Sequence, residues 1–326
     1  MTVYCYCRLL LPMKLLLLLF LPFTLLAQRR QLTVAPDGSG DYRTVQAAFD
    51  AVPDNNPEWL TILVKPGIYK EKLTLGALKT HVRLLGQDAA RTILTFDNYH
   101  ERTNLNTGQK YGTTGSASIH LFAADFTAEN ITFANSAGPV GQAVAAWVAG
   151  DRSCFRHCRF LGFQDTLYTY GYGSRQLYED CYVEGTVDFI FGSSTAWFER
   201  CTIVGKRGGF FTAASTPDTT RYGYVFNHCR LLGAPGTPAG AFYLGRPWRP
   251  YAKTVFLDCE LGTVVAPAGW DEWGKDSNKQ TAYYAEYQST GPGAAPAARA
   301  PWSHQLTPAE AARYTRAAVL RGWVPR

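Results

Sequence analysis

The sequence lacks the motifs of several common enzyme classes. It contains no Gly-x-Ser-x-Gly segment, which excludes the nucleophile turn of the serine hydrolases. No glycine-rich phosphate loop opens a helix, and the six histidines are scattered singly, with no pair at metal-ligand spacing. Any catalysis must therefore depend on other side chains.

The composition excludes further classes of protein. With only two methionines, the chain has no Met-rich adaptable binding surface. Hydrophobic residues make up 46% and charged residues 18%, a globular composition that excludes a long disordered tail. Without residues 1–27, which hold two basic residues and no acid, 30 basic residues face 26 acidic ones. This mild positive balance suits an acidic polymer as partner.

Residues 1–27 have the pattern of a secretory signal peptide. The run 15–26 is almost continuously apolar, follows Lys14 and ends at a small residue. It is short for a membrane span, which needs about 20 residues. We therefore expect export to the periplasm or the medium, with residues 28–326 as a single catalytic domain. Two alternatives stay open: translation starts at Met13, or the segment remains as an uncleaved anchor.

Five cysteines mark an internal repeat. Each lies three residues after a Phe or Tyr and three or four residues before a glycine, at intervals of 23, 20, 28 and 30 residues. The segment 126–133 is a sixth copy, shifted by one residue, with Asn130 in place of the cysteine. The repeated cysteines are Cys158, Cys181, Cys201, Cys229 and Cys259.

A repeat of this length with short strands and turn glycines is typical of a solenoid whose coils pair with their neighbours. The segments alternate at period two and are too short for helices. They predict an all-β fold, a right-handed single-stranded parallel β-helix. The cysteines would stack inside it as free thiols; disulfides, which export permits, are the alternative.

Three segments outside the repeat complete the expected fold. Between residues 42 and 52 apolar side chains recur at helical spacing, which predicts a helix capping the N-terminal end of the solenoid. The segment 307–320 begins Thr-Pro-Ala-Glu, a helix start, and predicts a helical tail that closes the other end. The polar stretch 98–118 predicts a long surface loop.

Polar residues interrupt apolar strand runs at intervals of one coil. Asp188 lies within Val-Asp-Phe-Ile-Phe, where a carboxylate is costly unless it is paired. Asp165 and Gln164 precede it by 23 and 24 residues, and Gln142 precedes Gln164 by 22. Because parallel strands lie about 4.8 Å apart, we expect these side chains on one face of three consecutive coils. Arg246 supplies a guanidinium that could pair with a carboxylate.

Two carboxylates one coil apart can differ in protonation. One held by an arginine stays ionised, whereas one in an apolar setting stays protonated. Glutamine amides beside them could stabilise a developing oxyanion. This set of groups fits acyl transfer or ester hydrolysis without serine or histidine. The alternative is an internal polar ladder that only stabilises the solenoid.

Five segments, in family order, resemble the signature motifs of the pectin methylesterases. They are Gly-Ile-Tyr-Lys-Glu at 67–71, Gly-Gln-Ala-Val-Ala at 141–145, Gln-Asp-Thr-Leu at 164–167, Asp-Phe-Ile-Phe-Gly at 188–192 and Leu-Gly-Arg-Pro-Trp at 244–248. Each motif alone has low specificity, but five in order are specific. Further similarity at 34–41, 284–293 and 302–306 extends the resemblance over essentially the whole chain after the signal.

The resemblance implies a β-helix that hydrolyses the C6 methyl esters of homogalacturonan to pectate and methanol, without metal or cofactor. Asp188 matches the family's nucleophile, and Asp165 matches the general acid that later acts as base. Gln142 and Gln164 match the oxyanion donors, and Arg246 matches the residue that orients Asp188. The residues matched to substrate contacts are Trp248, Thr113, Gln142, Tyr168 and Phe191. The implied partner is pectin, with no nucleic acid and, after signal cleavage, no membrane; we expect a monomer.

The chain departs from the family pattern at residues 168–175, a Tyr/Gly-rich stretch longer than in the common plant form, which leaves subsite preference open. The motifs begin directly after the signal, without an inhibitory pro-region, which predicts a bacterial source. Two alternatives remain. A galacturonan hydrolase or calcium-dependent lyase would need clustered acids, whereas this chain offers single aspartates flanked by amides. A related envelope protein acting on another ester or thioester would not need Trp248, because it has no sugar ring to stack.

Overall fold

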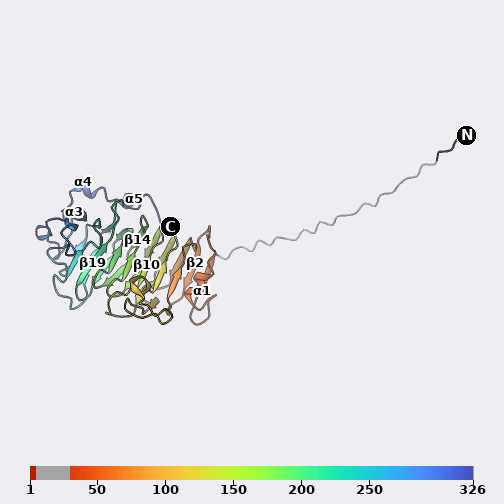
Figure 1. Ribbon diagram of the computed structural model, residues 1–326, viewed down its shortest axis with the longest axis horizontal. Coiled ribbons are helices and arrows are strands. Elements are labelled where there is room, and N and C mark those ends of the chain that lie inside the picture. The colour runs from red at the N-terminus through yellow and green to blue at the C-terminus, as the bar shows by residue number, and fades with distance from the viewer. Residues whose placement is uncertain (5–29, 326) are drawn as a thin grey trace.

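The computed structural model describes residues 1–4 and 30–325. Within these residues three parallel sheets run along one elongated solenoid, and each coil adds a strand to each sheet in turn (Figure 1). The predicted all-β, right-handed parallel β-helix is confirmed. The apolar run predicted as the core of a signal peptide lies outside the described residues. No helix among the described residues is both long and apolar enough to span a membrane.

The described strands form sheets of eleven, eight and seven strands, which we call sheets A, B and C. Sheet A consists of β1 (Gln31–Val34), β2 (Leu60–Val64), β5 (Val82–Gly86), β8 (Phe126–Glu129), β11 (Ser153–Arg156), β14 (Arg175–Glu179), β17 (Thr195–Glu199), β20 (Tyr224–Asn227), β23 (Lys253–Leu257), β25 (Tyr283–Tyr287) and β26 (His304–Gln305). Sheet B consists of β3 (Gly67–Lys70), β6 (Thr92–Phe96), β9 (Thr132–Asn135), β12 (Arg159–Leu161), β15 (Tyr182–Gly185), β18 (Thr202–Gly205), β21 (Arg230–Gly233) and β24 (Glu260–Leu261). Sheet C consists of β4 (Leu73–Leu75), β7 (Ile119–Leu121), β10 (Ala146–Val148), β13 (Leu167–Thr169), β16 (Ile190–Gly192), β19 (Gly209–Ala214) and β22 (Phe242–Gly245). The helices are α1 (Val45–Asp50), α2 (Gly112–Gly115), α3 (Asn278–Thr281), α4 (Pro308–Ala311), α5 (Arg316–Val319) and the 3-10 helix η1 (Pro296–Ala298).

The aromatic position of the repeat forms a stack inside the coils. Phe155, Tyr178, Phe198 and Phe226 occupy one register position on successive strands of sheet A. Their ring centroids are 5.0, 4.6 and 4.4 Å apart, with planes within 10° of parallel. All four are buried, and buried rings of this size dominate the apolar area of a core. The repeat therefore specifies the interior of the solenoid.

The repeated cysteines also point inward. Every cysteine between residues 30 and 325 is buried and free. The backbone N–H of Cys201 donates to Sγ of Cys229 at 3.4 Å, as expected for thiols stacked on adjacent coils. The prediction of free, stacked thiols is confirmed. Cys154, which stands outside the repeat, packs instead on the outer face of sheet A beside Leu177 and Trp197.

One residue with positive φ turns the chain from sheet A to sheet B in successive coils. It lies directly before the cysteine, with φ of 53° at Asp180 and 51° at Asp258. Asn130 has φ of 56° and occupies this turn, since β8 and β11 pair without a shift and place Ile131 beside Cys158. The expectation that Asn130 replaces a cysteine was therefore wrong. Its short polar side chain tolerates the left-handed conformation, and Ile131 fills the core position.

Helix α1 covers the first coil, as predicted (Figure 1). It begins after Thr44, whose hydroxyl accepts a hydrogen bond from the N–H of Ala47 at 3.3 Å. Its apolar face, Val45, Ala48 and Phe49, is buried in the main core. The spacing of apolar residues therefore located this helix correctly.

The C-terminal segment is helical but does not close the far end of the solenoid. It forms the two short helices α4 and α5, and the chain ends near the N-terminal coils (Figure 1). Val319 and Leu320 pack against Trp197 and its neighbours on the outer face of sheet A. The prediction failed because that face carries apolar side chains whose burial against the tail is favourable.

Candidate active site

Asp165 and Asp188 stand side by side on neighbouring coils. The pairing of β13 with β16 aligns Leu167 with Ile190, and each aspartate precedes its strand residue by two positions. The N–H of Asp165 donates to the carbonyl of Val187 at 3.1 Å, which continues this register. Both aspartates have positive φ, 62° and 55°. Aspartate tolerates this left-handed conformation better than most residues do.

Arg246 contacts the carboxylate of Asp188 with two parallel hydrogen bonds. Its Nε donates to Oδ1 at 2.8 Å and its second terminal nitrogen donates to Oδ2 at 2.7 Å. The rings of Phe210 and Trp273 lie 3.9 and 3.8 Å from the guanidinium carbon. The two hydrogen bonds and the two rings together fix the plane of the guanidinium.

Different surroundings set the pKa values of the two carboxyl groups. Burial raises the pKa of Asp165 well above its ordinary value, and the charge of Asp188 adds to that rise. Burial also raises the pKa of Asp188, but the hydrogen bonds and charge of Arg246 oppose the rise. Asp188 therefore loses its proton first, and its charge helps Asp165 to keep its own.

The two glutamines join the aspartates in one pocket. Gln142 and Gln164 form a parallel bridge between adjacent coils. The pocket measures about 420 Å³, and every residue predicted for catalysis or substrate contact lines it. These residues are Thr113, Gln142, Gln164, Asp165, Tyr168, Asp188, Phe191, Arg246 and Trp248.

Aromatic rings form one wall of this pocket. Tyr168 and Phe191 are adjacent in register and stack with centroids 4.3 Å apart and planes within 3°. Trp248 meets both rings edge-on, at 6.3 and 5.9 Å. Tyr168 and Phe191 are only 5% and 4% exposed and form the rigid part of this wall. Trp248 is the more accessible ring.

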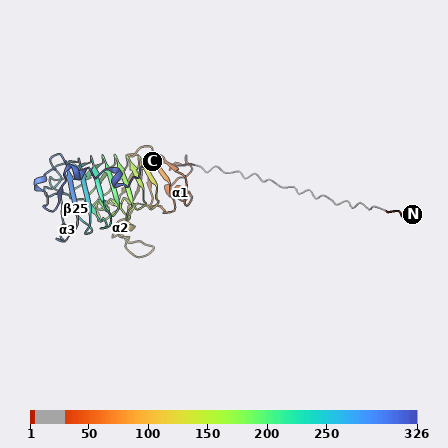
Figure 2. The same cartoon turned by 90° about the horizontal axis from the view of Figure 1, so that it is seen from above.

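Thr113 reaches the pocket from the predicted surface loop, which contains the short helix α2 and projects from the side of the solenoid (Figure 2). Its hydroxyl lies 3.1 Å from Nδ1 of His100 within the same loop. Lys72 donates to the carbonyl of Gly115 at 2.9 Å and ties the loop to the first coils. A loop outside the repeat thus supplies one wall of the site.

Sequence reasoning missed three residues that line the pocket, Thr114, Ala213 and Trp273. Ala213 stands in register with Phe191, so an offset of one coil could have identified it. Trp273 lies one coil beyond Arg246, in an irregular segment where Gly245 forms a parallel bridge with Trp270, and no motif marks its position. The backbone N–H of Trp273 donates to Oδ1 of Asp271 at 2.7 Å, which fixes the backbone of this residue.

The Tyr/Gly-rich segment 168–175 begins in the pocket and leads away from it. In the segment 168–175, Tyr168 is buried in the pocket, whereas Tyr172 is 79% exposed beyond it. A role of this segment in subsite preference stays a prediction. Among residues 1–4 and 30–325, no group of three or more His, Cys, Asp or Glu side chains is placed to hold a metal ion.

Known proteins are similar to this chain in sequence. Residues 31–323 match the family model described as Pectinesterase. Pectinesterase 31 from Arabidopsis thaliana is 40% identical over 294 residues, which cover 89% of this chain and 92% of the relative. A probable pectinesterase/pectinesterase inhibitor from the same plant is 37% identical over 91% of this chain, but the chain spans only 53% of that relative. These plant relatives give no support to the expected bacterial source.

Solved structures show the same architecture. A pectin methylesterase from carrot superposes with a TM-score of 0.82 at 33% identity, over 89% of this chain and 93% of that one. A mutant pectin methylesterase in complex with a hexasaccharide superposes with a TM-score of 0.80 at 31% identity, over 90% and 98%. The match runs through every coil that carries the pocket, and so this chain belongs to the pectinesterase family.

Proposed function

We propose that Asp188 is the nucleophile with which this carboxylic ester hydrolase removes methyl groups from pectin. One observation carries the assignment: the carboxylate is held by two hydrogen bonds from Arg246, beside a second carboxyl group, Asp165, whose pKa is raised well above its ordinary value by burial. This arrangement separates the nucleophile from the acid without a serine or a histidine.

The first half of the reaction forms an acyl-enzyme. An oxygen of Asp188 attacks the ester carbonyl carbon, and the carbonyl oxygen becomes a tetrahedral oxyanion. The side-chain amides of Gln142 and Gln164 donate to that oxygen. As the C–O bond to the methoxy group breaks, Asp165 gives its proton to the leaving oxygen, and methanol departs. An anhydride then joins Asp188 to the galacturonosyl residue.

The second half regenerates both aspartates. Asp165, now ionised, takes a proton from a water molecule while the water oxygen attacks the anhydride carbonyl of the sugar. The bond to Asp188 breaks, the sugar leaves as a carboxylic acid, and Asp188 is again a carboxylate held by Arg246. The burial that raises the pKa of Asp165 suits it to both proton transfers.

The rest of the pocket positions the polymer. Trp248 offers an accessible ring face on which a sugar can stack, supported by Tyr168 and Phe191. Thr113 contributes a hydroxyl from the opposite loop. We propose further that the enzyme is a secreted monomer whose signal peptide is residues 1–27, and that it binds pectin without nucleic acid or membrane.

The test measures methanol release from highly esterified homogalacturonan, with a chelator present. We expect the wild type to release methanol and Asp188→Ala to lose at least about a thousandfold of that rate. Asp276→Ala, which removes an acid on the surface, is the matched control. A folded Asp188→Ala that keeps a tenth of the activity would refute the assignment, and turnover of p-nitrophenyl acetate alone would favour another ester as substrate.

A further inference from the structure

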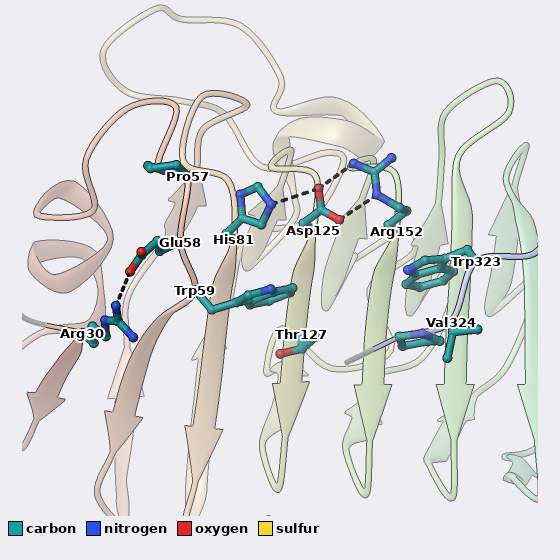
Figure 3. Close-up of a pocket in the computed structure, with 11 residues that line it drawn as sticks. Arg30, Pro57, Glu58, Trp59, His81, Asp125, Thr127, Arg152, Trp323 and Val324 are labelled. Atoms are coloured by element: carbon teal, nitrogen blue, oxygen red, sulfur yellow. Dashed lines mark hydrogen bonds and ion pairs between the residues drawn. The ribbon is translucent and has the colours of Figure 1, made fainter.

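A second groove lies on the outer face of sheet A, over the N-terminal coils (Figure 3). It measures about 580 Å³ and shares no lining residue with the active-site pocket. Strand β8 contributes to its floor, and the C-terminal residues Trp323 and Val324 form one side. The groove therefore exists only because the tail folds back along sheet A.

The floor of this groove holds an unpartnered hydroxyl. Thr127 on β8 is 5% exposed, and its buried Oγ1 has no hydrogen-bond partner among the described residues. Figure 3 shows this oxygen on the side of the groove that Trp59 borders. A buried hydroxyl without a partner is unfavourable, so a ligand whose binding uncovers this oxygen and supplies a partner gains a hydrogen bond here.

Two indole rings border the groove. Trp59 lies on one side and packs edge-on against the ring of His81, with centroids 5.6 Å apart and planes at 87°. Trp323 lies on the other side (Figure 3). Large rings that combine an apolar face with a polar edge suit a ligand with an apolar ring face and hydroxyl edges, as a sugar has.

The two arginines that line the groove each have an acidic partner. Arg152 donates to both carboxylate oxygens of Asp125, at 2.6 and 2.5 Å, and to Asp151 at 2.9 Å. Arg30 pairs with Glu58 at 2.8 Å. Because each arginine lining the groove has an acidic partner, the groove is poorly suited to a carboxylate and suits an uncharged ring with hydroxyl groups.

We infer that this groove binds an uncharged sugar unit of the polymer, a methyl-esterified galacturonosyl residue, and so holds esterified chain on the enzyme. This inference rests on the proposed function, which supplies the substrate. Removal of the methyl group creates a carboxylate that a groove with paired arginines does not match. The second site therefore favours esterified stretches over the product.

The test separates binding in the groove from catalysis. In the Asp188→Ala background, where the polymer keeps its esters, affinity electrophoresis through esterified homogalacturonan gives the apparent Kd. Thr127→Val keeps the side-chain shape and removes the hydroxyl, and Trp59→Ala removes a ring. We expect each to raise the Kd by about three- to tenfold, whereas Trp59→Phe restores most of the loss. Thr202→Val on sheet B is the matched control.

In the active enzyme, the same variants should keep the rate of methanol release from an esterified hexasaccharide, and their melting temperatures should report folding. Unchanged Kd values for Thr127→Val and Trp59→Ala would overturn the inference. The inference would also be overturned if these variants bound fully de-esterified pectate or a neutral galactan more weakly by the same factor. Failure of the proposed function is a distinct outcome, because the wild type would then release no methanol from either substrate.

Discussion

The guanidinium of Arg246 reaches the carboxylate of Asp188 across an intervening coil of the solenoid. Phe210 stands on that coil, in the strand β19 that pairs with β16, and its ring lies 3.9 Å from the guanidinium carbon. Ala213 lies on the same strand as Phe210. It stands in register with Phe191 of the preceding coil and also lines the pocket. The ion pair thus depends on the residues of three successive coils.

Replacing Arg246 by lysine should shift the pH dependence of the reaction. Lysine keeps the charge but cannot make both hydrogen bonds to the carboxylate. Because these bonds oppose the rise that burial causes, their loss lets the pKa of Asp188 rise further. We expect kcat to fall about thirtyfold or more and the acidic limb of the pH–rate profile to move to higher pH. Arg230→Lys, in the exposed pair with Glu260, is the control. An acidic limb at the same pH would contradict this role.

Trp273 should act as a positioning residue through Arg246. Trp273→Ala removes one of the two rings that enclose the guanidinium, and we expect kcat to fall about fivefold, the size of a cation–π contact. Trp273→Phe keeps a ring face and should restore most of the rate. Steady-state kinetics across pH distinguish this role from substrate contact. A change in KM alone, with the acidic limb unmoved, would assign Trp273 to sugar binding instead.

Asp165→Asn should change how stability depends on pH. Because burial raises the pKa of Asp165 in the folded state, the folded protein holds this proton more tightly than the unfolded chain. The stabilisation is complete below the unfolded pKa of about 3.9 and is lost as pH rises through the folded pKa. We expect the neutral amide to abolish that loss, so the melting temperature of the variant exceeds that of the wild type increasingly toward neutral pH. A constant difference between the two would contradict the prediction.

The stacked thiols should make the fold independent of reducing agents. Cys181, Cys201 and Cys229 are free and buried, as are the other cysteines between residues 30 and 325, so no disulfide in this part of the chain is available for a reductant to break. We expect the same melting temperature with and without dithiothreitol, and no reaction of a thiol reagent until the protein unfolds. Cys201→Ala should lower stability by about 1 kcal/mol through lost packing. A reductant-dependent melting temperature would show that cysteines pair after all.

The periodic elements were predictable because the same physical demand recurs in each coil. The coils that carry the repeat place an aromatic residue and a cysteine at fixed positions, and that spacing revealed the β-helix. The register error at Asn130 arose where the repeat lost its cysteine, since an asparagine can serve as a core substitute or as a turn residue. Only the pairing of β8 with β11 distinguished these two roles.

The sequence by itself determined the solenoid and the one-coil offset that aligns Asp165 with Asp188. It also supplied, at Arg246, a guanidinium able to pair with a carboxylate. These follow from local patterns, because a parallel strand repeats its environment after each coil. The tertiary structure alone decided that Trp273 encloses Arg246, and that the C-terminal tail folds back over sheet A and borders a second groove. Both contacts involve segments that lie outside the regular strands and the cysteine repeat, and the burial of apolar side chains contributes to placing them.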